Sequence, residues 1–228
     1  MKTIQANENE QVVEMPAGAV VLQGNLAIPE NAHGIVLFAH GSGSGRRSPR
    51  NRFVAQRLQE GGLATLLIDL LTEEEENVDQ YGGHLRFDIP MLAKRLIHAA
   101  DWLQANPSTN YLPIGCFGAS TGAAAALIAA AERPNVIGAV VSRGGRPDLA
   151  GNTLASVDAP TLLIVGGDDE PVIDMNEEAK RRLRTSIKEL VIVPGATHLF
   201  EEPGKLEEVA DLATDWFTRF LRREEMVT

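Results

Sequence analysis

The sequence lacks several features that define specialised protein classes. Cys116 is its single cysteine among 228 residues, which excludes an intramolecular disulfide framework. It contains no apolar run near the ~20 residues that span a bilayer, and residues 1–10 are polar. Lys and Arg total 21 against 31 Asp and Glu, so the net charge is −10. We therefore expect no nucleic-acid partner, no membrane partner and a cytoplasmic location.

The composition that remains is that of an ordinary globular protein. Hydrophobic residues make up 44% of the chain and charged residues 23%, enough for one sizeable core. No internal repeat or linker divides the chain. We therefore predict a single domain over residues 1–228, with residues 1–10 as a flexible N-terminus, and either a monomer or a homodimer.

Apolar segments and helical patterns alternate along the chain. Apolar runs without polar alternation are typical of strands covered on both faces. We expect such strands at residues 35–39, 64–70, 136–141, 161–165 and 190–193 and before residue 118, and an antiparallel edge pair at 11–14 and 19–28. We expect helices from residue 48 to 60 and at residues 89–106, 123–133, 176–186 and 204–222. The alternation predicts an α/β fold, a mostly parallel sheet with helices on both faces.

Two segments carry no clear pattern. Residues 71–88 form the longest irregular piece, and four consecutive glutamates at 73–76 indicate a solvated surface. Residues 148–160 form only a short connection between two strands. We expect neither segment to be a domain of its own.

The sequence Gly-Ala-Ser-Thr-Gly at residues 118–122 lies between an apolar strand and an alanine-rich helix. In a strand–turn–helix context, a Gly-x-Ser-x-Gly motif presents its serine on a sharp, exposed turn at the top of a sheet. Ser120 is therefore our candidate nucleophile, placed at a helix N-terminus where negative charge is favoured. The alternative is a glycine-rich turn whose serine only caps the helix.

Two further loops supply a candidate base and a candidate acid to act with this nucleophile. His198 follows the last expected strand, and an imidazole can accept and return the serine proton near neutral pH. Asp169 lies in the loop after the preceding strand, and a carboxylate there would orient the imidazole. We select Asp169 over Asp168 because Gly-Gly-x-Asp-x-x-Val is the common form of this loop. Asp168 would then be a turn or cap residue.

An oxyanion hole completes the set. The backbone N–H of Thr121, the residue after the nucleophile, would be one donor. Ser42, in the glycine-rich loop after the strand at residues 35–39, would supply the second backbone N–H. His40 is expected to shape this loop. The loop lacks the Gly-Lys-Ser/Thr ending of a phosphate-binding P-loop.

Together, these four motifs make the chain resemble the α/β-hydrolase superfamily and, within it, the dienelactone-hydrolase-like branch. The resemblance runs from about residue 20 to residue 221. It implies a sheet of about eight strands and a Ser-His-Asp hydrolase that needs no metal or organic cofactor. The sequence also resembles the hydrolase domains that are sometimes joined to phosphoribosyltransferases.

Two departures from the family limit what the resemblance implies. True dienelactone hydrolases carry cysteine as the nucleophile on the strand–helix turn, where this chain has Ser120. Cys116 lies inside the strand before that turn. The connection at residues 142–160 is too short for the helical lid of many lipases. We therefore expect an open site, without a lid domain, for small esters or lactones. A thioesterase, peptidase, acyltransferase or lyase on the same fold stays open, as does a binding protein with an idle triad.

Arginines follow two of the strands whose loops carry the candidate chemistry. Arg46 and Arg47 lie after the strand expected at residues 35–39, and Arg143 and Arg146 lie after the strand expected at residues 136–141. Guanidinium groups suit carboxylates and phosphates, so Arg47, Arg143 and Arg146 would favour an anionic substrate. In the alternative, these arginines pair at the surface with Asp148 or with the acidic run.

Overall fold

A computed structural model describes residues 10–222 and contains one eight-stranded sheet in the order β1-β2-β4-β3-β5-β6-β7-β8. The flexible segment expected at residues 1–10 lies outside the described residues, except for Glu10, which begins the first strand. The strands are β1 (Glu10–Ala17), β2 (Val20–Ala27), β3 (Ile35–Ala39), β4 (Ala64–Ile68), β5 (Ile114–Ala119), β6 (Ile137–Arg143), β7 (Thr161–Gly166) and β8 (Lys188–Val193). Five adjacent pairs, from β4–β3 to β7–β8, are parallel.

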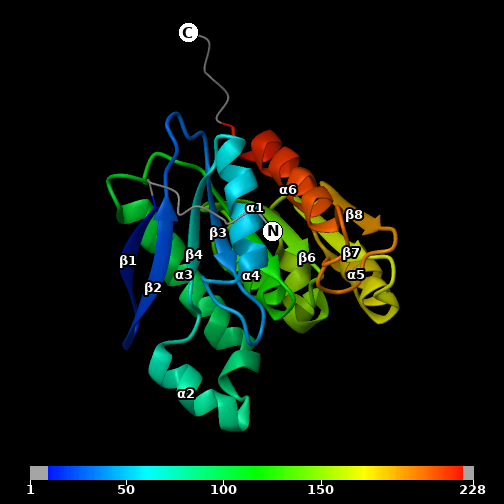
Figure 1. Ribbon diagram of the computed structural model, residues 1–228, viewed down its shortest axis with the longest axis horizontal. Coiled ribbons are helices and arrows are strands. Elements are labelled where there is room, and N and C mark those ends of the chain that lie inside the picture. The colour runs from blue at the N-terminus through cyan, green and yellow to red at the C-terminus, as the bar shows by residue number, and fades with distance from the viewer. Residues whose placement is uncertain (1–9, 223–228) are drawn as a thin grey trace.

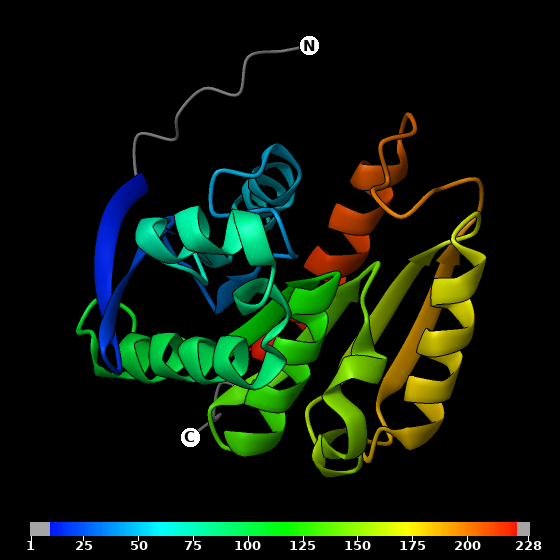
Figure 2. The same ribbon diagram turned by 90° about the horizontal axis from the view of Figure 1, so that it is seen from below.

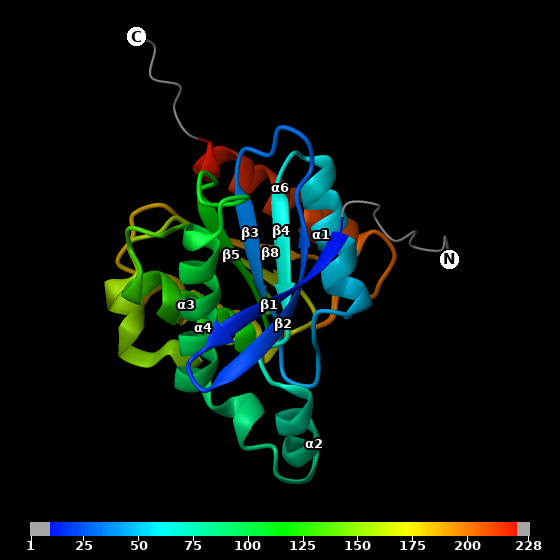
Figure 3. The same cartoon turned by 90° about the vertical axis from the view of Figure 1, so that its left-hand side faces the viewer.

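The N-terminal hairpin closes one edge of the sheet. β1 pairs with β2, and β2 pairs with β4, in both cases antiparallel. Figure 3 shows the two strands of this hairpin facing the viewer, in front of the parallel strands. An antiparallel edge pair needs no crossover helix, which is why the short turn at residues 18–19 joins them directly.

Helices cover both faces of the sheet, as expected (Figures 1 and 2). The helical segments are α1 (Pro49–Glu60), α2 (Glu73–Gly82), the short 3₁₀ turn η1 (Leu85–Phe87), α3 (Ile89–Ala105), α4 (Thr121–Glu132), the 3₁₀ segment η2 (Pro147–Ser156), α5 (Glu170–Arg182) and α6 (Lys205–Leu221). α1 and α6 pack on one face, and α3, α4 and α5 on the other. Because the parallel strands share a direction, the loops after β3, β5, β6, β7 and β8 meet at one edge.

The sequence explains why the core has two layers. Along β5, Cys116 belongs to the cluster under α3 and α4, whereas Phe117 belongs to the cluster under α1 and α6. Phe117 stacks against Phe38 of β3 with ring centroids 4.9 Å apart. Both faces of these central strands are apolar because both are covered.

The alanine-rich composition of α4 fits its position. This helix lies between the sheet, α3 and η2, and all of its alanines from Ala123 to Ala130 are fully buried. Small side chains let its neighbours approach from several sides, and alanine also has the highest helix propensity. The helix that follows Ser120 is therefore held on most of its circumference.

The prediction that residues 71–88 are irregular is wrong in part, because this segment contains α2 and η1. Thr72 caps α2, and its side chain and that of Glu75 form a reciprocal capping box. Glu75 also pairs with buried Arg95 of α3, at 2.6 Å between Oε2 and Nη1, so it is only partly exposed. The other three glutamates of the run are exposed, as expected. Figures 1 and 3 show α2 projecting beyond the layers of the sheet.

Several expected boundaries also differ from the structure. α5 begins at Glu170, well before the expected residue 176, because Pro171 fits the first turn of a helix. β6 continues to Arg143, since its last residues pair with β7. The connection expected at residues 148–160 contains η2, which packs against α4 and α5.

Candidate active site

Ser120 stands on a sharp turn between β5 and α4. Its backbone has φ 50° and ψ −122°, a positive φ that is rare for a residue with a side chain. The flanking glycines are required by close approach, since a Cβ on Gly118 would lie 2.4 Å from the Cα of Ala123, and one on Gly122 would lie 2.2 Å from the carbonyl oxygen of Ala39. The strain is therefore held by backbone packing on both sides of the serine.

Backbone hydrogen bonds fix this turn to the next strand. The N–H of Ser120 donates to the carbonyl of Arg143 at 3.2 Å, and the carbonyl of Ser120 accepts from Arg146 N–H at 3.0 Å. Ser120 occupies the N-cap position of α4, yet its side chain makes no capping hydrogen bond. Its hydroxyl therefore does not serve the helix, in contrast to the capping alternative.

The structure brings His198 and Asp169 together. Nδ1 of His198 lies 2.7 Å from Oδ2 of Asp169, and the two side chains are 38% and 15% exposed. Asp169 ends the turn after β7, and His198 lies in the loop between β8 and α6. A carboxylate that accepts from Nδ1–H leaves Nε2 as the basic nitrogen of the ring. Asp168, the neighbouring carboxylate, is exposed and makes no side-chain hydrogen bond among residues 10–222.

Ser120 and His198 lie on either side of one short segment. Arg143 bonds the N–H of Ser120, and the next residue, Gly144, is so close to the histidine loop that a Cβ on it would lie 2.9 Å from the carbonyl of His198 and 3.5 Å from its Nδ1. Within the described part of the chain, no hydrogen bond joins the serine hydroxyl to the imidazole. Such catalytic hydrogen bonds are often long before substrate binds.

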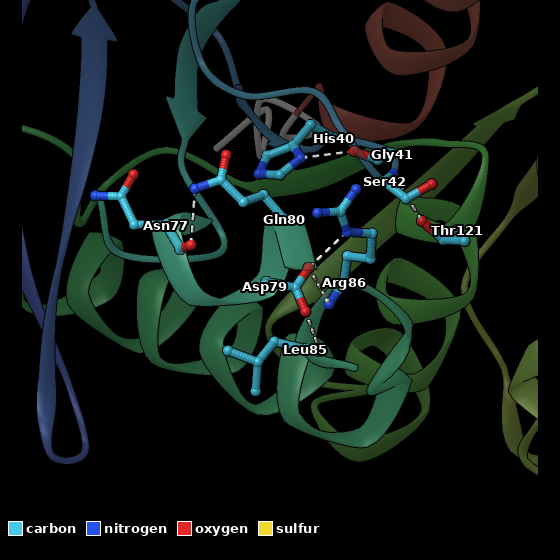
Figure 4. Close-up of polar contacts among 9 residues, drawn as sticks. All are labelled: His40, Gly41, Ser42, Asn77, Asp79, Gln80, Leu85, Arg86 and Thr121. Atoms are coloured by element: carbon cyan, nitrogen blue, oxygen red, sulfur yellow. Dashed lines mark hydrogen bonds and ion pairs between the residues drawn. The ribbon is translucent and has the colours of Figure 1, made fainter. Parts of the chain in front are cut away.

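The loop after β3 lies directly against Ser120. A Cβ on Gly41 would lie 2.9 Å from the Cβ of Ser120. The N–H of Ser42 donates to Oγ1 of Thr121 at 3.1 Å, an interaction drawn in Figure 4. The two residues that we expected to form the oxyanion hole are therefore in contact, through the threonine hydroxyl.

His40 fixes the shape of this loop, as the sequence indicated. Its Nε2 accepts from Leu70 N–H at 2.9 Å, so Nδ1 carries the proton and donates to the carbonyl of Gly41, also at 2.9 Å (Figure 4). Burial lowers the pKa of His40 below its ordinary value. The ring is therefore a neutral bridge between the ends of β3 and β4.

The arginines near the site have different environments. Arg146 forms a bidentate pair with Asp148, at 2.9 and 2.8 Å, which agrees with the surface-pairing alternative for this residue. Arg46 is buried and pairs with Asp69, at 3.2 Å between Nη1 and Oδ2. Arg47 is exposed. Arg143 was expected on a loop, but it is the last residue of β6, and it is buried.

Sequence reasoning did not select Arg86 of η1, which Figure 4 shows paired with Asp79. Its Nε pairs with the buried carboxylate of Asp79 in α2, at 2.5 Å, and that carboxylate also accepts from Leu85 N–H at 2.6 Å. Asp79 therefore closes the turn between α2 and η1. The signal that could have found this segment is the capping box at its start.

Cys116 is an inert core residue, as the sequence indicated. It is fully buried in β5, and burial raises the pKa of its thiol to about 12. Across residues 10–222, no three His, Cys, Asp or Glu side chains are grouped as metal ligands would be. No helix in the same range has the length and apolarity to cross a membrane.

The fold agrees with what comparison with known proteins finds. The model of the dienelactone hydrolase family matches residues 22–223. The crystal structure of a dienelactone hydrolase from Anabaena variabilis is 64% identical, with a TM-score of 0.92, over 93% of this chain and 98% of that one. The chain belongs to the dienelactone hydrolase family. It accordingly has the α/β-hydrolase fold expected from its sequence, and the family supports a hydrolase.

Other similar proteins differ from this chain in sequence or in length. A lidless α/β serine hydrolase from Xanthomonas campestris has a TM-score of 0.76 at 18% identity, over 96% of this chain and 98% of that one, and shows the shared fold. A protein of Mycobacterium tuberculosis that is provisionally named a phosphoribosyl transferase is 56% identical over 212 residues. These residues are 91% of this chain and 46% of that protein, so the chain spans about half the length of this relative.

Proposed function

We propose that this protein is a serine hydrolase that cleaves small carboxylic esters or lactones through an acyl-enzyme. The observation that carries the proposal is the hydrogen bond of 2.7 Å between His198 and Asp169, beside a serine held on a strained turn. The carboxylate orients the imidazole and stabilises the imidazolium that forms when the ring takes a proton.

In the first step, Oγ of Ser120 attacks the substrate carbonyl carbon while Nε2 of His198 removes the hydroxyl proton. Negative charge develops on the carbonyl oxygen. The N–H groups of Thr121 and Ser42 would stabilise this oxyanion, and the hydroxyl of Thr121 holds the second of these groups in place. The helix N-terminus of α4 adds to the stabilisation, since Thr121 is its first residue.

In the second step, the imidazolium of His198 protonates the leaving alkoxide, and the bond between carbonyl carbon and alkoxide oxygen breaks. Water then enters, His198 takes its proton, and the resulting hydroxide attacks the acyl-enzyme. Collapse of the second tetrahedral intermediate returns the proton to Ser120. A lactone follows the same route, except that its leaving alkoxide stays attached to the acyl group.

A small substrate is the best match for this fold. The segment in which many lipases insert a lid is η2, which packs on α4 and α5 instead of extending over the nucleophile. Ser42 is exposed and His198 is partly exposed, so solvent reaches both sides of the nucleophile. Water can therefore resolve the acyl-enzyme without a lid opening.

Labelling with a fluorophosphonate probe tests the proposal. We expect an adduct on Ser120, located by mass spectrometry, that is absent from Ser120→Ala and strongly reduced in His198→Ala. Ser186→Ala, which changes an exposed serine in the loop before β8, serves as the matched control and should label fully. A folded wild-type protein that gives no adduct would contradict the proposal and favour a binding protein.

A substrate panel then distinguishes between the reactions that the same serine could catalyse. The panel contains esters, lactones, thioesters and peptides that share one acyl group. We expect hydrolysis of the oxygen esters or lactones, and we expect Ser120→Ala to lose this activity. Faster turnover of the thioester or of the peptide would assign a different leaving group. Transfer of the acyl group to an added alcohol, in preference to water, would indicate an acyltransferase.

A further inference from the structure

Arg143 is a buried cation without a partner. Its side chain is only 7% exposed, and its Nε and Nη1 atoms are buried with no hydrogen-bond acceptor among residues 10–222. No carboxylate in that range forms an ion pair with it. Removing a charge from water without compensation is costly, and burial accordingly lowers the pKa of Arg143 to about 10. The guanidinium still carries its charge at neutral pH.

The place of Arg143 in the fold is next to the nucleophile. Its backbone pairs with Ala119 of β5, and its carbonyl accepts the N–H of Ser120. Side chains alternate along a strand, so Arg143 shares its face with Ala139 and Val141, which lie in the core under α1 and α6. The guanidinium therefore lies on the α1 side of the active-site edge.

A second arginine lies on the same side. Arg50, in the first turn of α1, is near enough for its charge to lower the pKa of Arg143 further. One end of Arg50 pairs with Glu201, at 2.7 Å, while its Nε is buried with no partner in the described range. Because Glu201 follows the histidine loop, Arg50 links the start of α1 to that loop. Asn51, next to it, also has a buried, unpaired side-chain oxygen.

Two other arginines near the site are neutralised by carboxylates, which distinguishes them from Arg143. Arg146 is held by Asp148 and Arg46 by Asp69. A purely structural arginine has such a carboxylate or a set of carbonyls as partners. Arg143 has neither, so its unused donors are available for a ligand.

We propose that Arg143, together with Arg50, binds a phosphate monoester group of the substrate whose ester or lactone carbonyl Ser120 attacks. This proposal rests on the proposed function. The two oxygens of a carboxylate would occupy the unused Nε and Nη1 of Arg143, whereas a phosphate has a third oxygen for the unused Nε of Arg50, whose Nη1 stays paired with Glu201. The three terminal oxygens of the phosphate match the unused donors on the two guanidinium groups.

Binding of inorganic phosphate tests the site without depending on catalysis. The protein used is Ser120→Ala, which cannot form an acyl-enzyme, and calorimetry compares it with the double variant that also carries Arg143→Gln. We expect phosphate binding to be weakened at least about 30-fold by Arg143→Gln. Arg184→Gln, which removes an exposed charge, should leave binding unchanged. Acetate should bind more weakly than phosphate.

A stability measurement separates a ligand site from a structural role. In phosphate-free buffer, Arg143→Met should raise the melting temperature, because it removes a buried charge that has no counterion. A structural arginine would instead lower the melting temperature when it is replaced. In the wild-type background, adding phosphate should raise the melting temperature, and Arg143→Met should abolish that rise.

The outcomes discriminate between the two proposals. If phosphate fails to bind Ser120→Ala, binds equally after Arg143→Gln, or binds no better than acetate, the phosphate site is refuted. Fluorophosphonate labelling of Ser120 does not depend on any of these results. A labelled serine without phosphate binding would therefore leave the hydrolase intact and remove the substrate assignment alone.

Discussion

Thr121→Val is the substitution that most directly tests how the oxyanion hole is built. Valine keeps the backbone N–H and the shape of threonine but lacks the hydroxyl that accepts the N–H of Ser42 at 3.1 Å. Thr121 is only 5% exposed, so no large rearrangement of solvent is expected at that position. The change therefore leaves one oxyanion donor in place and releases the other.

The size of the effect follows from the two environments. Complete loss of an oxyanion donor costs about 100- to 1,000-fold in rate. Here the donor is released but not removed, and Ser42 is exposed, so water can hydrate its N–H. A hydrogen bond of this kind contributes about 1 kcal/mol, which corresponds to a fall of roughly fivefold in kcat.

The assay is the acylation rate with 4-nitrophenyl acetate, measured by stopped flow. Thr121→Ser, which restores the hydroxyl, should recover most of the wild-type rate. KM should change less than kcat, because the loop positions a transition-state contact. If Thr121→Val were as fast as wild type or faster, the threonine hydroxyl would be competing with the oxyanion, and its role in holding the Ser42 donor would be refuted.

Two further predictions concern stability. Glu75→Gln should lower the free energy of unfolding by about 2 kcal/mol, because it removes the carboxylate that pairs with buried Arg95, whereas Glu74→Gln on the exposed face should have almost no effect. Equal urea midpoints for the two variants would contradict this. The lowered pKa of His40 means that the unfolded chain takes a proton there before the folded one, so this residue costs stability as the pH falls below about 6.5. Between pH 7.5 and 5.5, wild type should therefore lose more stability than His40→Gln does. Parallel losses in the two proteins would show that His40 does not titrate in this range.

The sequence was sufficient for those parts of the site that are local. Ser120, Asp169 and His198 each follow a strand, and in a parallel sheet those strand ends meet at one edge. Pattern and topology together therefore predicted their proximity. The hydrogen bond between Ser42 and Thr121 joins loops that are far apart in the chain, and no local pattern encodes it.

The errors have identifiable causes. The acidic run at residues 73–76 hid α2, because the helix has little apolar periodicity and is held by a capping box and by Arg95. Arg143 looked like a loop residue, since charged residues rarely end a buried strand. Its position depends on pairing with β7, which is a tertiary contact. Local propensity is therefore informative where packing confirms it and fails where packing overrides it.

The positive φ of Ser120 also places a limit on how stable this fold can become. Glycine is the residue that adopts such a backbone without strain, so relief of the strain at this turn would come with loss of the hydroxyl. Consensus or cavity-filling substitutions could strengthen the rest of the domain, but under the proposed mechanism stability and activity oppose each other at this position. The chain must therefore hold Ser120 in an unfavourable conformation by means of the surrounding strands and helix.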